Sequence, residues 1–273
     1  MSTVEPATTG GAAPAGAPAA GTFAPRPFAA AYHRQVRAQA AMETRLLVRN
    51  GEQVLLAVVI PVLALVGGVL GARRLGVEFA HPTVDVLAPG VLALAVMSTS
   101  FTSLAIATGF ERRYGLLKRL GASPLPRTGL LLGKVGALLL VQALQVVVIS
   151  AVALALGWDP AWRGAPAALL AALLGTAAFA GLALALAGAL RAEATLAAAN
   201  LVYLLLMAGG AVVLPRTSYG AAGDVLQLLP SAALGDAMRT ALIDGGVAVV
   251  PLLVLLGWTV LGTALAAKLF TWE

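Results

Sequence analysis

The stretch GLLLGKVGALLLVQALQVVVISAVALALG, residues 129–157, is an almost unbroken run of apolar side chains. A membrane-spanning helix needs about 20 such residues to cross roughly 30 Å of hydrocarbon, so this run can span a bilayer with some tilt or projection. Its one charge, Lys134, lies about a turn and a half from the start, where a long side chain can extend back to the lipid head groups. The run predicts a transmembrane helix.

The rest of the chain follows the same pattern. Of its 273 residues 60% are hydrophobic and 11% are charged, and the mean hydropathy is +0.92, which is too apolar for a soluble domain. The expected fold class is an all-α integral membrane protein with six transmembrane helices preceded by an interfacial helix. The six predicted spans cover about 53–71, 86–109, 129–157, 165–190, 196–214 and 247–268.

Two segments precede the first span. Residues 1–27 are rich in Ala, Pro and Gly and cannot bury enough apolar surface to fold, so we expect a disordered tail. Residues 28–50 carry apolar residues on one helical face and arginines on the other, which predicts an amphipathic helix in the membrane interface. Glu43 falls on the apolar face, and a structural ion pair explains it better than a role in transport.

A second amphipathic pattern follows Pro230, at about residues 231–244, and ends at Gly245 and Gly246. We expect a short helix on or in the leaflet opposite the N-terminus, serving either as an external lid or as a passive interfacial helix.

The basic residues predict the orientation, because short cytoplasmic segments are enriched in Lys and Arg. Of the 18 basic residues, 13 fall on the side of the N-terminus, which leaves five on the other side: Arg73, Arg74, Arg163, Arg216 and Arg239. Both termini are therefore expected in the cytoplasm. The dominance of Arg, Ala and Gly is typical of a GC-rich bacterial genome, so the expected location is a bacterial plasma membrane.

Several chemistries are excluded by what the sequence lacks. The chain has no cysteine and only two histidines, so thiol chemistry and a histidine metal site are not expected. Residues 129–134 resemble a phosphate-binding loop, but Thr128 stands where the first glycine is required and Val135 follows the lysine. We expect no catalytic, cofactor-binding or metal-binding residue, and no nucleic-acid partner because the basic residues flank apolar spans.

The acidic residues all fall in the tail, in interfacial segments or in loops, whereas ion-coupled transporters carry titratable groups within their spans. The polar residues within the predicted spans are uncharged. They either line a path for an amphipathic substrate or make ordinary interhelical hydrogen bonds, as Gln142, Gln145 and Thr176 would. The candidate path residues are Ser98, Thr99, Thr102, Ser103, Asn200 and Tyr203. Gly67 and Gly71, and the small residues of the fourth span, permit close helix packing.

One polar segment, residues 111–127 (ERRYGLLKRLGASPLPR), interrupts the apolar sequence between the second and third spans. An acid that favours a helix N-terminus, a leucine strip, four basic residues and two helix-stopping prolines predict a short helix suited to docking another protein. The alternative is a positively charged loop that only sets the topology.

This segment and the layout of residues 28–273 resemble the membrane subunit of ABC-2-type transporters, the permeases of ATP-binding cassette exporters. Phe110-Glu111-Arg112-Arg113-x-Gly115-Leu116-Leu117-Lys118-Arg119-Leu120, followed by Ser123-Pro124, is similar to the cytoplasmic signature of that family, and the closing Phe270-Thr-Trp-Glu273 is similar to its usual ending. The resemblance implies that 111–127 is a coupling loop that contacts the ATPase through these residues: Glu111, Arg112, Arg113, Gly115, Leu116, Leu117, Leu120 and Pro124.

The resemblance further implies two permease subunits, expected as a homodimer, with two separate ABC ATPase subunits that bind ATP and magnesium. The expected substrate is a small hydrophobic or amphipathic compound, such as a drug, an antibiotic or a lipid-like molecule, which is exported through a membrane permease that is not itself an enzyme. Two other functions stay open, namely an ion-coupled secondary transporter or channel, and a non-transporting membrane scaffold or assembly protein.

Overall fold

A computed structural model describes residues 31–49, 51–116 and 127–269, and in this part of the chain all regular structure is helical. Six helices are long and apolar enough to cross a membrane, in agreement with the six predicted spans. These candidate spans are Ala57–Leu75, Thr83–Arg113, Leu132–Ala155, Trp162–Ala189, Ala192–Gly209 and Val249–Leu269.

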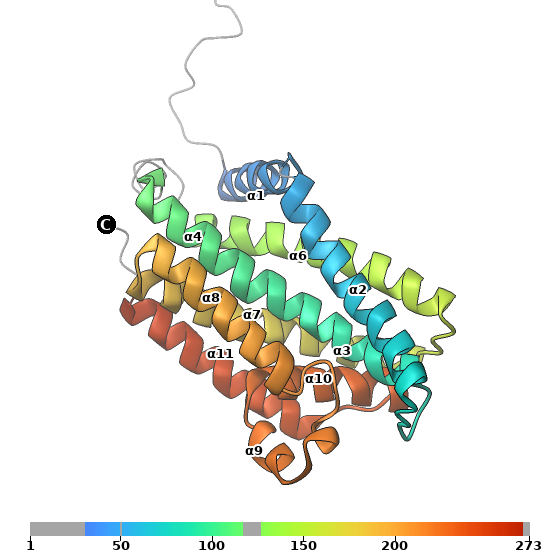
Figure 1. Ribbon diagram of the computed structural model, residues 1–273. Helices are drawn as coiled ribbons and strands as arrows, with labels where there is room; N and C mark the ends of the chain where they lie inside the picture. The colour runs from blue at the N-terminus through green and yellow to red at the C-terminus, as the bar shows by residue number, and fades with distance from the viewer. Residues whose placement is uncertain (1–30, 50, 117–126, 270–273) are drawn as a thin grey trace, which may run out of the picture.

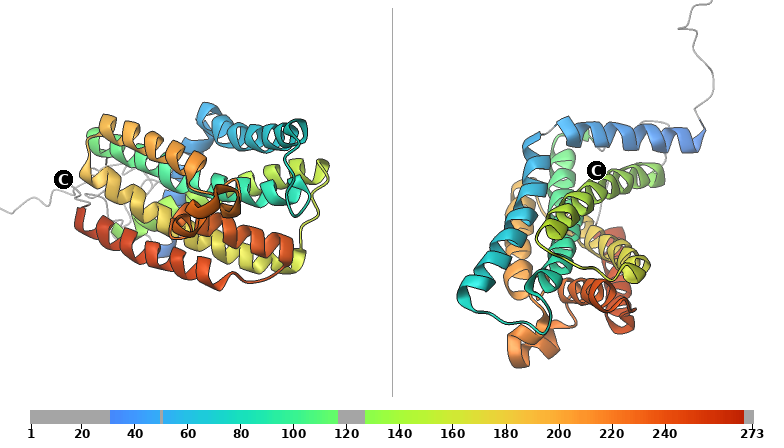
Figure 2. Two further views of the ribbon diagram at one scale, coloured as in Figure 1. Left: turned by 60° about the horizontal axis from the view of Figure 1, so that its bottom comes forward. Right: turned by 90° about the vertical axis from the view of Figure 1, so that its right-hand side faces the viewer.

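The helices pack side by side as an inclined bundle (Figure 1). Along the chain they are α1 (Tyr32–Arg49), α2 (Gly51–Leu75), α3 (Thr83–Met97), the π-helix η1 (Ser98–Ser103), α4 (Leu104–Arg113), α6 (Arg127–Ala155), η2 (Trp162–Gly164), α7 (Ala165–Ala189), α8 (Ala192–Gly209), η3 (Arg216–Ala222), α9 (Gly223–Leu226), α10 (Pro230–Arg239), the π-helix η4 (Thr240–Asp244) and α11 (Val249–Leu269). Helix α1 lies across one end of the bundle, whereas α9 and α10 lie at the opposite end (Figure 2). We call these the α1 end and the α10 end.

The second span is one continuous helix with a wider turn in the middle. Helices α3, η1 and α4 run from Thr83 to Arg113 without a break, and the segment Ser98–Ser103 has π-helical hydrogen bonding. A π-turn inserts extra residues into an α-helix and rotates the side chains that follow it. Almost every residue from Val84 to Ala105 is buried, so this helix forms the centre of the bundle.

Helices α7 and α11 pack along each other through two glycines. A methyl group built on Gly181 would come within 2.7 Å of the carbonyl carbon of Gly262, so the two backbones are already in close contact. This confirms the expected close packing by small residues of the fourth span. Gly67 and Gly71 behave differently, because no atom of the neighbouring described helices lies within 4 Å of a methyl group built on either of them.

Two predicted elements need correction at the α10 end. The fifth span was expected to reach residue 214, but α8 ends at Gly209, because the chain turns at Gly210 and Ala211, and Ala211 has a φ of 53°. The helix predicted at 231–244 exists as α10 and η4, and it ends at Gly245 in the left-handed conformation. Nine of the ten residues of α10 are buried, so it is inserted among α3, α7 and α11 instead of lying on a surface.

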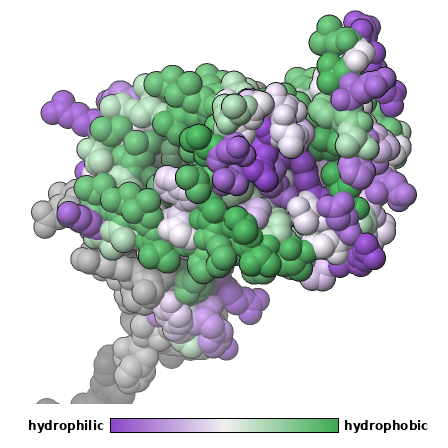
Figure 3. Space-filling view, turned by 90° about the horizontal axis from the view of Figure 1, so that it is seen from below, coloured by the Kyte–Doolittle hydropathy of each residue, from purple (hydrophilic) through white to green (hydrophobic). Residues whose placement is uncertain are grey.

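The outer surface of the bundle is apolar. Leu63, Val147, Leu205 and Val260 are each more than 60% exposed, as expected for side chains that contact lipid. Seen from the α10 end, hydrophilic residues gather within a largely hydrophobic surface (Figure 3).

Candidate functional site: the charged junction at the α1 end

The predicted coupling segment begins inside a helix. Glu111, Arg112 and Arg113 form the last turn of α4, and the helix ends at Tyr114 and Gly115, where Gly115 has a φ of 66°. Leu116 is the last described residue before the gap at 117–126. The expectation that Glu111 favours a helix N-terminus is wrong, because it lies at the C-terminal end of α4. Leu117, Leu120 and Pro124 lie outside the described residues.

The side chain of Glu111 turns inward, to a lysine that it shares with a second glutamate. The Lys134 Nζ atom lies 2.5 Å from Glu111 Oε1 and 3.2 Å from Glu43 Oε1. The side chain of Lys134 is 7% exposed, and those of Glu43 and Glu111 are 14% and 15% exposed. The three residues join α1, α4 and α6, and we call them the Lys134 junction.

This junction corrects one prediction and supports another. Lys134 was expected to extend to the head groups, but its ammonium group is buried because two carboxylates lie within reach. Glu43 was expected to make a structural ion pair, and it does. Glu111, which the sequence placed in a loop, is a largely buried acid inside a candidate span.

Helix α1 is held tightly against α6 next to the junction. Gln39 donates a hydrogen bond of 2.9 Å to Glu43 Oε1, so that oxygen accepts from both Gln39 and Lys134. A methyl group on Gly133 would come within 2.5 Å of the Gln39 side chain. Helix α1 is therefore fixed to the start of α6, directly after the segment that joins α4 to α6.

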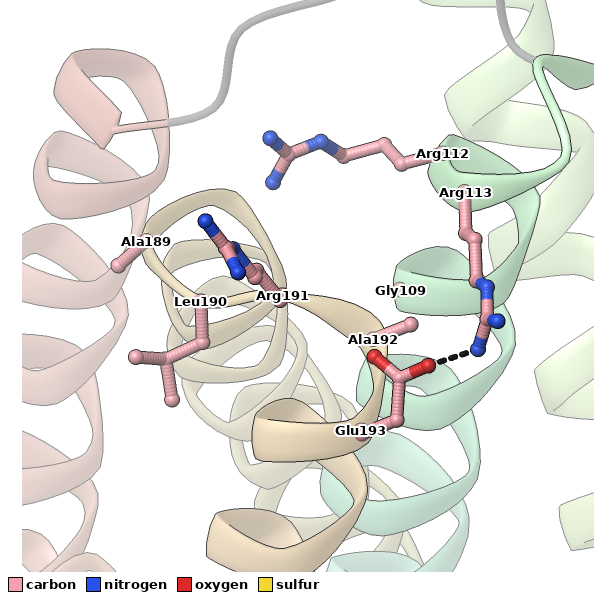
Figure 4. A pocket seen from close by; sticks show the side chains of 8 residues that line it. All are labelled: Gly109, Arg112, Arg113, Ala189, Leu190, Arg191, Ala192 and Glu193. Carbon is pink, nitrogen blue, oxygen red and sulfur yellow. Dashed lines mark hydrogen bonds and ion pairs between the residues drawn. The ribbon is translucent and has the colours of Figure 1, made fainter.

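The other two charges of the last turn of α4 face the connection between α7 and α8. Arg112 Nη1 donates to the carbonyl oxygens of Ala187 and Gly188, where α7 ends. Arg113 forms an ion pair with Glu193 in the first turn of α8. Arg112, Arg113 and Glu193 border a pocket of about 460 Å³, into which Arg191 also extends (Figure 4).

The polar residues of the π-helix divide between two sides. Thr99 is 3% exposed and donates to Gln145 Oε1, and the Gln145 amide donates to the carbonyl of Ala57 in α2, both at 2.8 Å. Ser100 is also buried, whereas Ser98 is half-buried. Thr99 thus faces α6 inside the bundle, and that Ser98, Thr99, Thr102 and Ser103 line a substrate path stays a prediction.

A second set of hydrogen bonds extends this polar core. Gln142 donates to Ser100 Oγ at 2.9 Å and accepts from Thr176 at 3.0 Å. Thr99, Gln142, Gln145 and Thr176 thus make the interhelical hydrogen bonds that were one of the two alternatives for span polar groups. The sequence named the glutamines and Thr176 correctly, but it did not identify Ser100, because Ser100 is one of five Ser and Thr residues at positions 98–103 and the pattern does not show which of them face α6.

The remaining candidate path residues are more accessible. Ser98, Thr102 and Ser103 are half-buried, and Asn200 is exposed. An apolar groove of about 420 Å³ lies nearby, between η1, α7, α8 and α11, and the six candidates do not line it. Their neighbours do, since its lining includes Phe101, Leu186, Val202, Leu206 and Trp258.

A buried arginine organises the α10 end. Arg239 Nη2 donates to the carbonyls of Val212 and Val213, both at 2.7 Å, and Nη1 donates to Asp236 at 3.2 Å. Asp236 also pairs with Arg216 at 3.1 Å. Burial lowers the pKa of Arg239 to about 10, although Asp236 opposes the shift, and burial raises the pKa of Asp236 against the effect of both arginines.

The sequence treated Arg239 as a topology charge in an external loop, whereas the structure uses it to hold the turn after α8. Gly90 of α3 makes room for this contact, because a methyl group there would come within 2.9 Å of Arg239 Nη2. The sequence did hold a signal of this buried role, because Arg239 is the one basic residue in a short and largely apolar helix, where a charge needs a partner.

Clusters of three or more metal-ligating side chains are absent from the described residues. The geometry offers two buried charge networks at opposite ends of a bundle with an uncharged polar core, and this arrangement suits the transmission of movement.

Comparisons with known proteins give one result on the family. A search of curated proteins found no match. The family model described as "ABC-2 family transporter protein" matches residues 81–268, which covers five of the six candidate spans and the whole segment between α4 and α6. This match sets aside the secondary transporter, the channel and the scaffold that the sequence left open. The chain thus belongs to the ABC-2 family of transporter proteins, as a multi-pass, non-catalytic membrane permease subunit.

Proposed function

We propose that the chain is the permease of an ABC exporter in a bacterial plasma membrane, with both termini in the cytoplasm. Two copies of the chain and two copies of a separate ABC ATPase form the transporter, and ATP with magnesium binds to the ATPase. The substrate is a small hydrophobic or amphipathic compound, such as a drug, an antibiotic or a lipid-like molecule.

The observation that carries this proposal is the position of the Lys134 junction. The segment 111–127 connects α4 to α6, and Glu111 at its start pairs with Lys134 of α6, which also pairs with Glu43 of α1. A force applied to the segment by a bound ATPase reaches three helices through one buried cluster. As a coupling residue, Glu111 would act through Lys134 and not by touching the ATPase.

The apolar groove supports the substrate class. Its lining is almost entirely hydrocarbon, with Phe101 and Trp258 as the aromatic members. Such a surface favours compounds that already dissolve in the membrane. The orientation follows from the charge count, with 13 of 18 basic residues on the side of the N-terminus.

A pair of matched substitutions tests the coupling segment. Leu116, directly after Gly115, is 36% exposed, and Leu75 is 79% exposed at the far end of α2. We expect Leu116→Asp to abolish co-purification with the ATPase, because it places a charge in the apolar contact strip. Leu75→Asp should leave co-purification intact. Equal binding by both variants would show that the segment is not the docking element.

Transport is tested with the same proteins in vesicles. With the ATPase and ATP, the wild-type complex should move a lipophilic fluorescent dye or a fluorescent phospholipid, and the Leu116→Asp complex should move neither. Movement driven by an ion gradient without any ATPase would contradict the proposal and favour a secondary transporter.

A further inference from the structure

The pocket between α4 and the α7–α8 connection carries an excess of positive charge. Three arginines and one glutamate line it, so its net charge is +2, and Gly109, Ala189, Leu190 and Ala192 complete the wall. Figure 4 shows Arg112 reaching across from α4 and the guanidinium group of Arg191 rising beside it, while Arg113 points away to Glu193.

The donors of these arginines are unequally used. Glu193 neutralises Arg113, and Arg112 uses Nη1 to bind the two carbonyls at the end of α7. The other nitrogens of Arg112, and all of those of Arg191, make no hydrogen bond or ion pair with any residue that the structure describes. Because each guanidinium group presents five N–H donors, the pocket keeps a set of converging donors for an anion.

The start of α8 adds to this potential. Helix α8 runs for 18 residues from Ala192, and Arg191, which precedes it, gives no side-chain cap. The first N–H groups of a helix have no partner within the helix and carry a partial positive charge. This end of α8 lies in the wall of the same pocket, because Ala192 and Glu193 line it together with Arg112 and Arg191.

The position of the pocket at the ends of three candidate spans indicates which anion it suits. Three candidate spans begin or end in its wall, namely Thr83–Arg113, Trp162–Ala189 and Ala192–Gly209. Each of them changes there from apolar sequence to charged sequence, which is the level at which lipid phosphates lie. The wall combines the apolar residues Ala189, Leu190 and Ala192 with arginines, which suits the acyl chain and the phosphate group of a lipid.

We propose that this pocket binds the phosphate of an anionic phospholipid, with Arg191 and Arg112 as the donors. A bound lipid would bridge α4 to the α7–α8 connection, next to the last turn of α4 from which the segment 111–127 departs. This binding does not require the ATPase, so its failure and the failure of the proposed function are separate results.

The test uses the full chain without the ATPase, purified in a neutral detergent, and dioctanoyl phosphatidylglycerol as the probe. Affinity is read from the thermal stabilisation at increasing lipid concentration. We expect Arg191→Gln to weaken binding roughly five- to tenfold, since it removes one charge beside an anionic head group. Arg191→Lys should retain most of the affinity, and Arg73→Gln, at the opposite end of the bundle, should leave it unchanged.

Three further measurements can overturn the proposal. Dioctanoylglycerol, which lacks the phosphate, must show no stabilisation that depends on Arg191. Inorganic phosphate must bind much more weakly than the lipid, because equal binding would make the site one for free phosphate. The pocket does not serve a lipid if Arg191→Gln keeps the wild-type lipid affinity, or if Arg73→Gln lowers it. The same conclusion follows if Arg191→Gln loses ATPase binding but keeps its lipid affinity.

Discussion

Replacing Lys134 by methionine is expected to destabilise the protein strongly. The change keeps the length of the side chain but removes the charge that faces Glu43 and Glu111, whose side chains are 14% and 15% exposed. Removing one partner of a buried ion pair leaves an uncompensated charge and costs about 3–5 kcal/mol. Here two carboxylates lose their shared partner, and the second oxygen of Glu111, Oε2, is already buried without a described hydrogen-bond partner.

The size of the effect can be converted into a melting temperature. For a protein of roughly 150–250 residues, 1 kcal/mol shifts Tm by about 2–4 °C, so Lys134→Met should lower Tm by about 6–20 °C. The assay is thermal unfolding of the detergent-purified protein, followed by size-exclusion chromatography. The matched control is Lys268→Met, because Lys268 is exposed in the last turn of α11 and should change Tm little.

A triple variant separates charge from packing. Lys134→Met combined with Glu43→Gln and Glu111→Gln removes all three charges, and replacing a whole buried ion network with neutral groups is often close to neutral in stability. We expect the triple variant to recover most of the lost Tm. The reasoning is refuted if Lys134→Met melts like the wild type, or if the triple variant is no more stable than the single one.

Three other predictions follow from the packing and from the α10 end. Gly181→Ala should cost about 1–3 kcal/mol by overpacking against α11, whereas Gly257→Ala, which has open space around it, should be neutral or stabilising by up to about 1 kcal/mol; equal Tm values would contradict the close contact. Gln145→Leu should cost about 1–3 kcal/mol of stability, because it loses one hydrogen bond to each of two helices. Thr99→Val should cost less in the Gln145→Leu background than alone, and additive costs in a double-mutant cycle would show that the two side chains do not interact. Burial raises the pKa of Asp236, so the folded protein binds the proton of this carboxyl more tightly than the unfolded chain does. Asp236 therefore adds stability as the pH falls from neutral towards about 4, and this stability is lost as the pH rises. The Tm of the wild type minus that of Asp236→Asn should increase on acidification, and a constant difference would argue against the shift.

The parts of the fold that the sequence predicted well are local in origin. A run of about 20 apolar residues is a property of one segment, so the six spans and the helix at 28–50 could be found without knowledge of their neighbours. The misplaced end of the fifth span has a distant cause. Residues 210–214 are apolar enough for a helix, but the carbonyl of Val212 is held by Arg239, 27 positions further along the chain.

The same distinction explains the candidate site. Lys134 near the end of a span predicts an exposed charge when the span is considered alone, and only the arrival of Glu43, 91 positions earlier, and of Glu111, 23 positions earlier, buries it. The hydrogen bond of Thr99 has the same kind of cause, because its partner Gln145 lies 46 positions further along the chain.

The helix from Thr83 to Arg113 has a mechanical consequence. At about 1.5 Å per residue, its 31 residues form a rod of about 46 Å. Glu111 is held by Lys134 near one end of it, and Gly90 lies against the Arg239 contact near the other, about 30 Å away. A rod held at both ends cannot shift at one end alone unless its backbone yields between them. The π-helical segment Ser98–Ser103 is where the hydrogen-bond spacing of this helix already differs. We therefore expect the helix to change its length or its rotation there when the two ends of the bundle move by different amounts.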